Sequence, residues 1–199
     1  MKARIFSTLG PALLAVSTLL SVATSTLAQE APKVKFATSA GDFVVEVYPD
    51  KAPKTVENFL QYVADKHYDG TVFHRVIENF MVQGGGFDAQ FNQKKTRAPV
   101  AHEGREALAK GGPKNVVGTL AMARTSDPHS ATVQFFINVK DNVFLDPSAQ
   151  QPGYTVFGKV TSGMEVIQKI KVTPTGAAGP FPSDVPKTPI LINSATLVK

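Results

Sequence analysis

The chain has 199 residues, a formal net charge of +5, no cysteine and four histidines without HxxxH or HxH spacing. This length fits one domain with a sizeable core, and the composition excludes disulfides, thiol catalysis and zinc–thiolate sites and predicts no metal centre. The basic residues are scattered. The densest cluster is Lys94, Lys95 and Arg97, which we interpret as a solvated loop and not as a nucleic-acid surface.

The first 28 residues have the three parts of a signal peptide. Lys2 and Arg4 supply positive charge, residues 11–22 are uncharged and largely apolar, and Thr26-x-Ala28 supplies small residues at the cleavage site. A membrane anchor is the alternative, but the apolar run is short for a bilayer of roughly 30 Å. We expect cleavage after Ala28, which leaves residues 29–199 as one exported domain of charge 5 − 2 = +3 with no stable membrane association.

Two β-rich runs, residues 34–38 and 43–48, flank a small-residue turn and predict an antiparallel hairpin. The period then changes, because Val56, Phe59, Leu60 and Val63 recur at helical spacing after Pro53. A second helix is predicted where Met164, Val166, Ile167 and Ile170 recur in the same way.

Further strands are predicted at residues 71–77, 80–83, 116–123, 134–139, 155–160 and 190–198. Residues 87–115 are polar and irregular, and residues 173–189 are rich in proline and glycine, so both are predicted as loops. Many short strands with one helix near each end predict a mainly β fold, a closed or nearly closed antiparallel barrel capped by two α-helices.

Arg75 interrupts an apolar strand, next to Phe73 and Val76. An arginine in such a place is either one half of a structural ion pair or a donor directed into a cleft. Met81 and Gln83 are two residues apart in the next strand and therefore share a face. An apolar side chain beside an amide suits a proline ring and its carbonyl.

Four blocks closely resemble motifs of the cyclophilin family, in the family's order and spacing. They are Phe73-His74-Arg75-Val76-Ile77-x-x-Phe80-Met81-x-Gln83-Gly84-Gly85, Gly118 to Ala123, Gln134 to Ile137 and Val156 to Val160. The periplasmic cyclophilins of Gram-negative bacteria are the most similar branch. The resemblance implies an eight-stranded barrel with two capping helices, isomerisation of X-Pro bonds in exported polypeptides without a cofactor, and a periplasmic location. Nothing in the sequence resembles a coiled coil, so a monomer is the default expectation. The rival function is a proline-recognising holdase in which catalysis is not essential.

The resemblance also implies a role for each site residue. Arg75 is the catalytic residue, Gln83 binds the substrate backbone, Ala123 and Arg124 present main-chain groups, and Gln134 holds Arg75 in place. The proline pocket consists of Phe80, Met81, Phe136 and Leu145. Many eukaryotic members carry Trp where Phe144 stands and His where Tyr154 stands, so we expect catalysis to survive and cyclosporin to inhibit weakly. His74 is expected to face away from Arg75 and to be structural.

Overall fold

The structure is a computed structural model that describes Met1 and residues 30–198. The predicted signal peptide therefore lies outside the described residues except for Met1. Within the described part of the chain, the helices are all too short or too polar to cross a bilayer.

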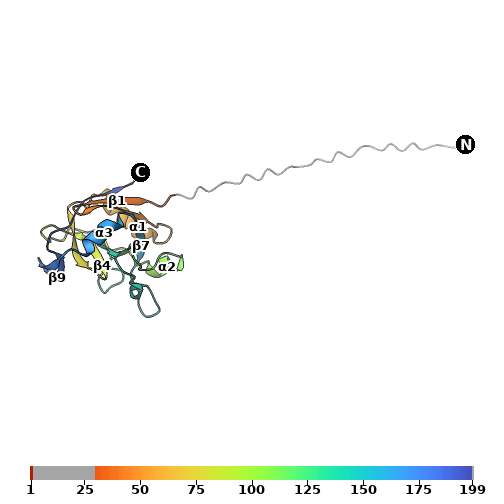
Figure 1. Cartoon of the computed structure of the whole chain (residues 1–199). Helices are drawn as coiled ribbons and strands as arrows, with labels where there is room; N and C mark the ends of the chain where they lie inside the picture. The colour runs from red at the N-terminus through yellow and green to blue at the C-terminus, as the bar shows by residue number, and fades with distance from the viewer. Residues whose placement is uncertain (2–29, 199) are drawn as a thin grey trace.

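Eight strands close into a barrel in the order β1-β10-β3-β4-β6-β5-β7-β2, and all neighbours are antiparallel (Figure 1). The predicted mainly β, closed eight-stranded barrel is thus confirmed. The strands are β1 Lys33–Thr38, β2 Gly41–Val47, β3 Thr71–Ile77, β4 Met81–Asp88, β5 Thr119–Met122, β6 Phe135–Asn138, β7 Val156–Ser162 and β10 Leu191–Leu197.

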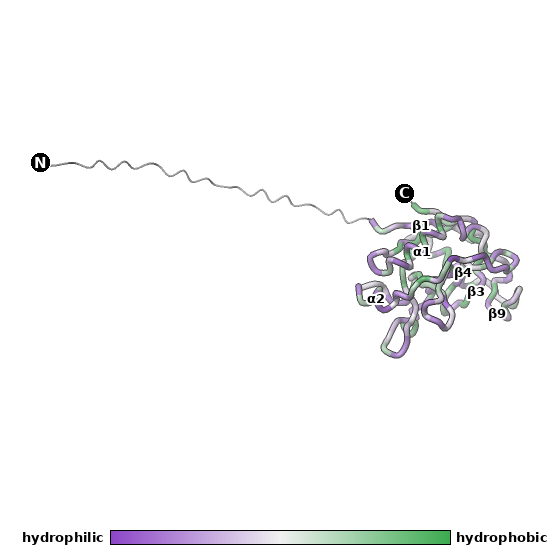
Figure 2. Tube along the Cα trace, turned by 180° about the vertical axis from the view of Figure 1, so that it is seen from behind, coloured by the Kyte–Doolittle hydropathy of each residue, from purple (hydrophilic) through white to green (hydrophobic). Residues whose placement is uncertain are grey.

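Aromatic rings fill the inside of the barrel. Phe36 lies at their centre, and its ring centroid is 5.0 Å from that of Phe43, 5.4 Å from Phe135 and 5.9 Å from Tyr68. Alternate strand residues point inward, so each strand contributes one apolar face to this core. Figure 2 shows the hydrophobic stretches along the barrel strands and mostly hydrophilic loops around them.

Helices α1 Pro53–Ala64 and α3 Met164–Lys171 lie where the sequence predicts them. Each buries one apolar face, with Val56, Phe59 and Val63 on α1 and Val166, Ile167 and Ile170 on α3. A third helix, α2 Gly104–Ala109, was not predicted, and neither was the 3-10 turn Val143–Leu145. Part of the predicted loop at residues 87–115 is therefore helical, and β4 extends through the glycines to Asp88.

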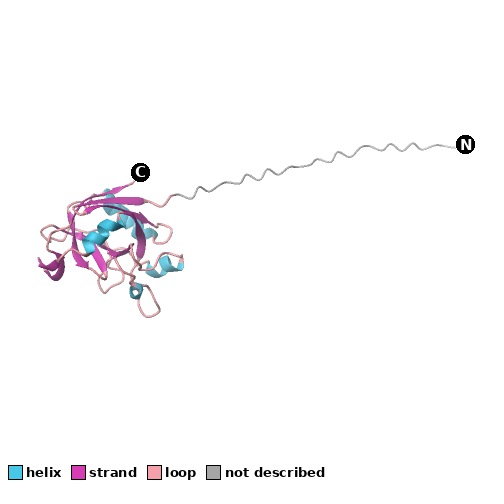
Figure 3. Cartoon of the chain, in the orientation of Figure 1, coloured by secondary structure: helices cyan, strands magenta, loops and turns pink. Residues whose placement is uncertain are grey.

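The prediction of a loop at residues 173–189 is wrong. Strands β8 Thr175–Ala178 and β9 Phe181–Pro186 pair there as a two-stranded sheet beside the barrel, labelled at β9 in Figure 1 and drawn as strands in Figure 3. Proline signalled a loop because it cannot donate to a strand ladder, but a two-stranded sheet has free edges where proline is tolerated.

The cluster Lys94, Lys95 and Arg97 was interpreted as a solvated loop, but two of its side chains bond to other parts of the protein. Lys94 Nζ donates to the carbonyl oxygens of His67 and Asp69, and the Arg97 guanidinium pairs with Asp65 at the end of α1. Two of the three basic side chains therefore anchor this segment to the turn that follows α1.

Candidate active site

A β-bulge in β3 turns Arg75 to the outer face of the barrel. Phe73 pairs with Gly84 and Arg75 pairs with Gln83, so two steps along β3 match one step along β4. In regular strand Phe73 and Arg75 would share a face. The extra residue at the bulge separates them, and Phe73 is buried in the core at 1% exposure while the Arg75 side chain is 44% exposed.

The strand register then assembles a row of side chains on this outer face. Gln83 lies opposite Arg75 on one side and opposite Phe136 on the other, and Phe136 lies opposite Ala121. Directly opposed residues of antiparallel strands point to the same face. Residues that are distant in the sequence therefore become neighbours across four strands.

A pocket of about 720 Å³ opens along this row. Ten of the eleven predicted site residues line it, namely Arg75, Phe80, Met81, Gln83, Ala123, Arg124, Gln134, Phe136, Leu145 and Tyr154. Phe144 does not line it. Its side chain is 62% exposed and stacks on Phe80 at the rim, with centroids 5.8 Å apart. The sequence did not identify the remaining lining residues, which are His74, Phe87, Gln93, Thr96, Thr125, Ser130, Thr132 and Phe181.

The floor of the pocket is apolar and separate from the barrel core. Met81, Ala121, Phe136 and Val156 form a second buried cluster, against which Phe80, Leu145 and Tyr154 pack. The Tyr154 ring meets Phe136 edge to face at 5.5 Å. Phe136 and Leu145, which composition alone would place in a core, thus form a small core of their own beneath the site.

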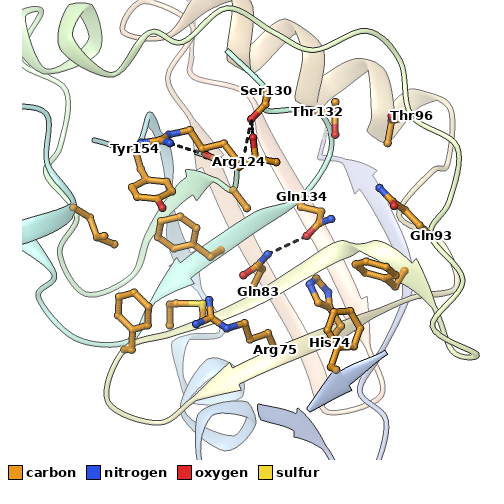
Figure 4. Close-up of a pocket in the computed structure, with 18 residues that line it drawn as sticks. His74, Arg75, Gln83, Gln93, Thr96, Arg124, Ser130, Thr132, Gln134 and Tyr154 are labelled. Carbon is orange, nitrogen blue, oxygen red and sulfur yellow. Dashed lines mark hydrogen bonds between the residues drawn. The ribbon is translucent and has the colours of Figure 1, made fainter. Parts of the chain in front are cut away.

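Gln134 contacts a different partner from the one predicted. Its Oε1 accepts a hydrogen bond of 3.0 Å from Gln83 Nε2 (Figure 4), and no hydrogen bond joins it to Arg75 within residues 30–198. The close approach depends on Gly86, because a Cβ there would lie 2.5 Å from Gln134 Cγ. Gln134 therefore orients the Gln83 amide and only indirectly the arginine beside it.

Arg75 has one ion-pair partner among the described residues, and it was not predicted. Its Nε lies 4.0 Å from Oδ2 of Asp184, a residue of β9. The terminal nitrogens of the guanidinium have no hydrogen-bond acceptor within residues 30–198. They lie at the pocket, on the wall opposite Arg124 and Tyr154 in Figure 4.

The Arg124 side chain stabilises the opposite wall. Its Nε and Nη2 donate to the Gly153 carbonyl at 3.1 and 2.8 Å, and its guanidinium carbon lies 4.5 Å from the centre of the Tyr154 ring. The Ala123 N–H donates to the Gln134 carbonyl at 2.9 Å. The Ala123 N–H is thus already bonded within the protein, so the Ala123 carbonyl is the main-chain group of this residue that could accept a hydrogen bond from a peptide.

His74 does not face away from the pocket as expected, because the bulge interrupts the alternation. It lines one end of the pocket, 3% exposed, with ring centroids 4.7 Å from Phe87 and 5.4 Å from Phe181. Burial, with a smaller effect of the Arg75 charge, lowers the pKa of His74 to about 4. The ring is therefore neutral at neutral pH.

A buried polar network supports the rim that carries Phe144 and Leu145. Asn142 Nδ2 donates to the Phe80 carbonyl at 2.8 Å and to Asn138 Oδ1 at 2.7 Å. Behind them Asn115 donates to Asp146 Oδ1 through its main-chain N–H at 2.7 Å and its amide at 2.9 Å. The sequence signal for this network was three asparagines and an aspartate near apolar residues, which is too general to have identified it.

No three acidic or histidine side chains of the described residues come together as metal ligands. The pocket combines an apolar floor, two linked amides and a guanidinium. That combination suits an extended peptide, which carries both apolar side chains and a polar main chain.

Comparison with known proteins gives the family. The family described as cyclophilin type peptidyl-prolyl cis-trans isomerase matches residues 33–197, and this chain belongs to it. The sequence is 52% identical over 168 residues to the peptidyl-prolyl cis-trans isomerase cyp18 of Streptomyces antibioticus, covering 83% of this chain and 98% of that protein. It is 51% identical over 167 residues to peptidyl-prolyl cis-trans isomerase B of Escherichia coli, covering 82% and 98%.

A third relative, peptidyl-prolyl cis-trans isomerase A of Dickeya dadantii, is 46% identical over 188 residues and covers 94% of this chain and 96% of its own. A crystal structure of a cyclophilin type isomerase from Cryptosporidium parvum matches with a TM-score of 0.67 at 24% identity, over 85% of this chain and 98% of that one. The same protein, crystallised in the presence of the dipeptide ala-pro, matches with a TM-score of 0.66 at 25% identity, over 84% and 99%. The chain is thus a peptidyl-prolyl cis–trans isomerase.

Proposed function

We propose that Arg75 is the catalytic residue of this isomerase and that the enzyme acts on X-Pro bonds of exported proteins. The observation that carries the proposal is the position of the Arg75 guanidinium at the edge of the apolar floor formed by Met81 and Phe136, with its terminal nitrogens not bonded to other described residues. A proline ring on that floor would bring its amide nitrogen to the guanidinium.

The chemistry needs a donor and no nucleophile. Resonance gives the peptide C–N bond double-bond character and a rotation barrier of about 18–20 kcal/mol. Twisting the bond returns the lone pair to the prolyl nitrogen, which then accepts a hydrogen bond more strongly than the planar amide does. A donor whose interaction strengthens only during the twist lowers the barrier, because catalysis depends on binding the transition state better than the substrate.

The surroundings of Arg75 favour such an interaction. A peptide seated on the apolar floor would displace water and lower the local dielectric, which would strengthen a hydrogen bond from the guanidinium. A charge-assisted hydrogen bond contributes roughly 1.5–3 kcal/mol. At about 1.36 kcal/mol for each tenfold change in rate, Arg75 would supply about one to two orders of magnitude. The remaining acceleration would come from the fixed geometry of the pocket.

The other side chains would hold the peptide. We propose that Gln83, oriented by Gln134, binds the substrate main chain and that Phe80, Met81, Phe136 and Leu145 enclose the ring. Tyr154, braced by Arg124, would close the far wall. The crystallisation of the Cryptosporidium relative with the dipeptide ala-pro supports a ligand of this size and chemistry.

The export of the protein is part of the proposal. The predicted signal peptide, residues 1–28, favours export, and the resemblance to periplasmic cyclophilins favours the periplasm as the place where the enzyme acts on unfolded polypeptides. We propose that it acts there as a monomer. N-terminal sequencing of the protein recovered from a periplasmic extract should begin at Gln29, and an N-terminus at Met1 would contradict export with cleavage.

NMR exchange spectroscopy on a short Ala-Pro peptide tests the role of Arg75. The wild type should accelerate cis–trans exchange, and Arg75→Ala should lose about one to two orders of magnitude while peptide affinity is largely retained. Arg105→Ala is the matched control, because it removes the same charge from α2, outside the pocket. Peptide binding without accelerated exchange in the wild type would favour the holdase, and full activity in Arg75→Ala would remove Arg75 from the mechanism.

A further inference from the structure

We propose that Asp184 is a positioning residue that holds the Arg75 guanidinium in its reactive orientation. This inference rests on the proposed catalytic role of Arg75. The carboxylate of Asp184 is the ion-pair partner of Arg75 among the described residues, with Oδ2 4.0 Å from Nε. It belongs to β9, a strand outside the barrel that the sequence had predicted as loop.

The β8–β9 sheet is fixed against the barrel strand that carries Arg75. The Phe181 ring lies 5.1 Å from Phe87, 5.4 Å from His74 and 6.0 Å from Phe91, measured between ring centroids. These aromatic contacts anchor β9 beside β3, since each ring buries a large apolar surface. The hairpin therefore holds Asp184 at a defined distance from the arginine instead of leaving it on a free loop.

The backbone at Asp184 also departs from regular strand. Its φ is +65°, in the left-handed region that is uncommon for residues other than glycine, asparagine and aspartate. Such a residue interrupts the alternation of β9, much as the bulge does in β3. Asp184 thus stands where the chain departs from regular strand, and its side chain is directed to the proposed catalytic group.

The pairing has a specific consequence for Arg75. Arginine has five N–H donors, one on Nε and four on the terminal nitrogens. The Asp184 carboxylate, 4.0 Å from Nε, is too far away for a hydrogen bond, but its charge restrains the long side chain from the Nε side and leaves the four terminal donors for the peptide. Because the Arg75 side chain is 44% exposed and that of Asp184 is 36% exposed, water screens the pair. The expected effect is therefore modest, about fivefold in rate, which corresponds to about 1 kcal/mol.

The experiment compares Asp184→Asn and Asp184→Gly with the wild type in the same Ala-Pro exchange assay. Both substitutions suit a positive φ, so the backbone is preserved, and the first removes the charge while the second removes the side chain. We expect kcat to fall about fivefold in each, with KM changed less than twofold and the melting temperature nearly unchanged. Ser183→Ala, an exposed neighbour on β9, is the control and should retain full activity.

A double-mutant cycle with Arg75→Ala separates positioning from other effects. If Asp184 acts through Arg75, Asp184→Asn should lower the rate in the wild type and have no further effect in the Arg75→Ala background. An equal loss in both backgrounds would overturn the inference, as would full activity in both Asp184 variants. In either case the proposed function would stand if the wild type accelerates exchange and Arg75→Ala does not. If the wild type itself does not accelerate exchange, the proposed function fails, independently of Asp184.

Discussion

Replacement of Glu103 by alanine should destabilise the barrel by removing the cap of α1. The helix has no capping side chain of its own, because Ala52 occupies the N-cap position. Glu103 supplies the missing acceptors from 48 and 49 residues away. Its Oε2 accepts from the Thr55 N–H at 2.8 Å and from the Thr55 hydroxyl at 2.7 Å, and its Oε1 accepts from the Lys54 N–H at 3.1 Å.

The magnitude follows from the burial of these groups. Glu103 is 7% exposed and Thr55 is 1% exposed, so water cannot fully replace the lost acceptors. Loss of an N-cap costs about 0.5–2 kcal/mol, and a carboxylate near a helix N-terminus contributes up to about 2 kcal/mol in a partly buried site. We expect Glu103→Ala to lower the free energy of unfolding by about 3 kcal/mol and the melting temperature by about 6–12 °C.

Urea unfolding followed by circular dichroism measures this loss. Glu106→Ala is the matched control, because Glu106 is an exposed glutamate three residues further along and should cost less than about 1 kcal/mol. Thr55→Val, which removes only the hydroxyl, should cost about 1 kcal/mol and should cost less in the Glu103→Ala background. Equal destabilisation by Glu103→Ala and Glu106→Ala would refute the capping argument.

Two further predictions concern the pocket. Burial lowers the pKa of His74 to about 4, whereas an unfolded histidine has a pKa of about 6.5. Between these two pH values the unfolded chain binds more protons than the folded one, so the free energy of unfolding falls as the pH drops through this window. Urea unfolding should show a loss of about 2 kcal/mol between pH 7 and pH 5 that His74→Leu reduces, and an unchanged pH slope in the variant would contradict this. Phe144 lacks an indole N–H, so cyclosporin should inhibit the wild type weakly and Phe144→Trp more strongly. A low-nanomolar inhibition constant for the wild type in the exchange assay would contradict this second prediction.

The barrel could be predicted from the sequence because its signals are local. Strand alternation, the helical spacing of Val56, Phe59 and Val63, and turn residues all depend on neighbours within about ten positions. The helices α1 and α3 therefore begin and end within a few residues of their predicted places. Most of the pocket was also predictable, but through resemblance, since composition alone assigns Phe136 and Leu145 to a core.

The missing parts depend on contacts between residues far apart in the chain. The β8–β9 sheet contains Pro182 and Pro186, which indicate a loop locally, and it is stabilised by the packing of Phe181 on rings from β4 and the segment after it. The hydrogen bond from Gln83 to Gln134 spans 51 residues. Its geometry depends on the missing Cβ of Gly86, which no property of Gln134 itself reveals.

The bulge in β3 explains why the site strand departs from the rule that predicts the others. A strand with strict alternation places residues two apart on one face, so it would bury both Phe73 and Arg75 or expose both. One extra residue at His74 allows the strand to bury the Phe73 ring in the barrel core and to place the Arg75 guanidinium at the pocket. The same residue shift brings the imidazole of His74 to the end of the pocket, where Phe181 packs on it and β9 brings Asp184 to Arg75. A single irregularity thus links the core, the proposed catalytic residue and the hairpin that holds it.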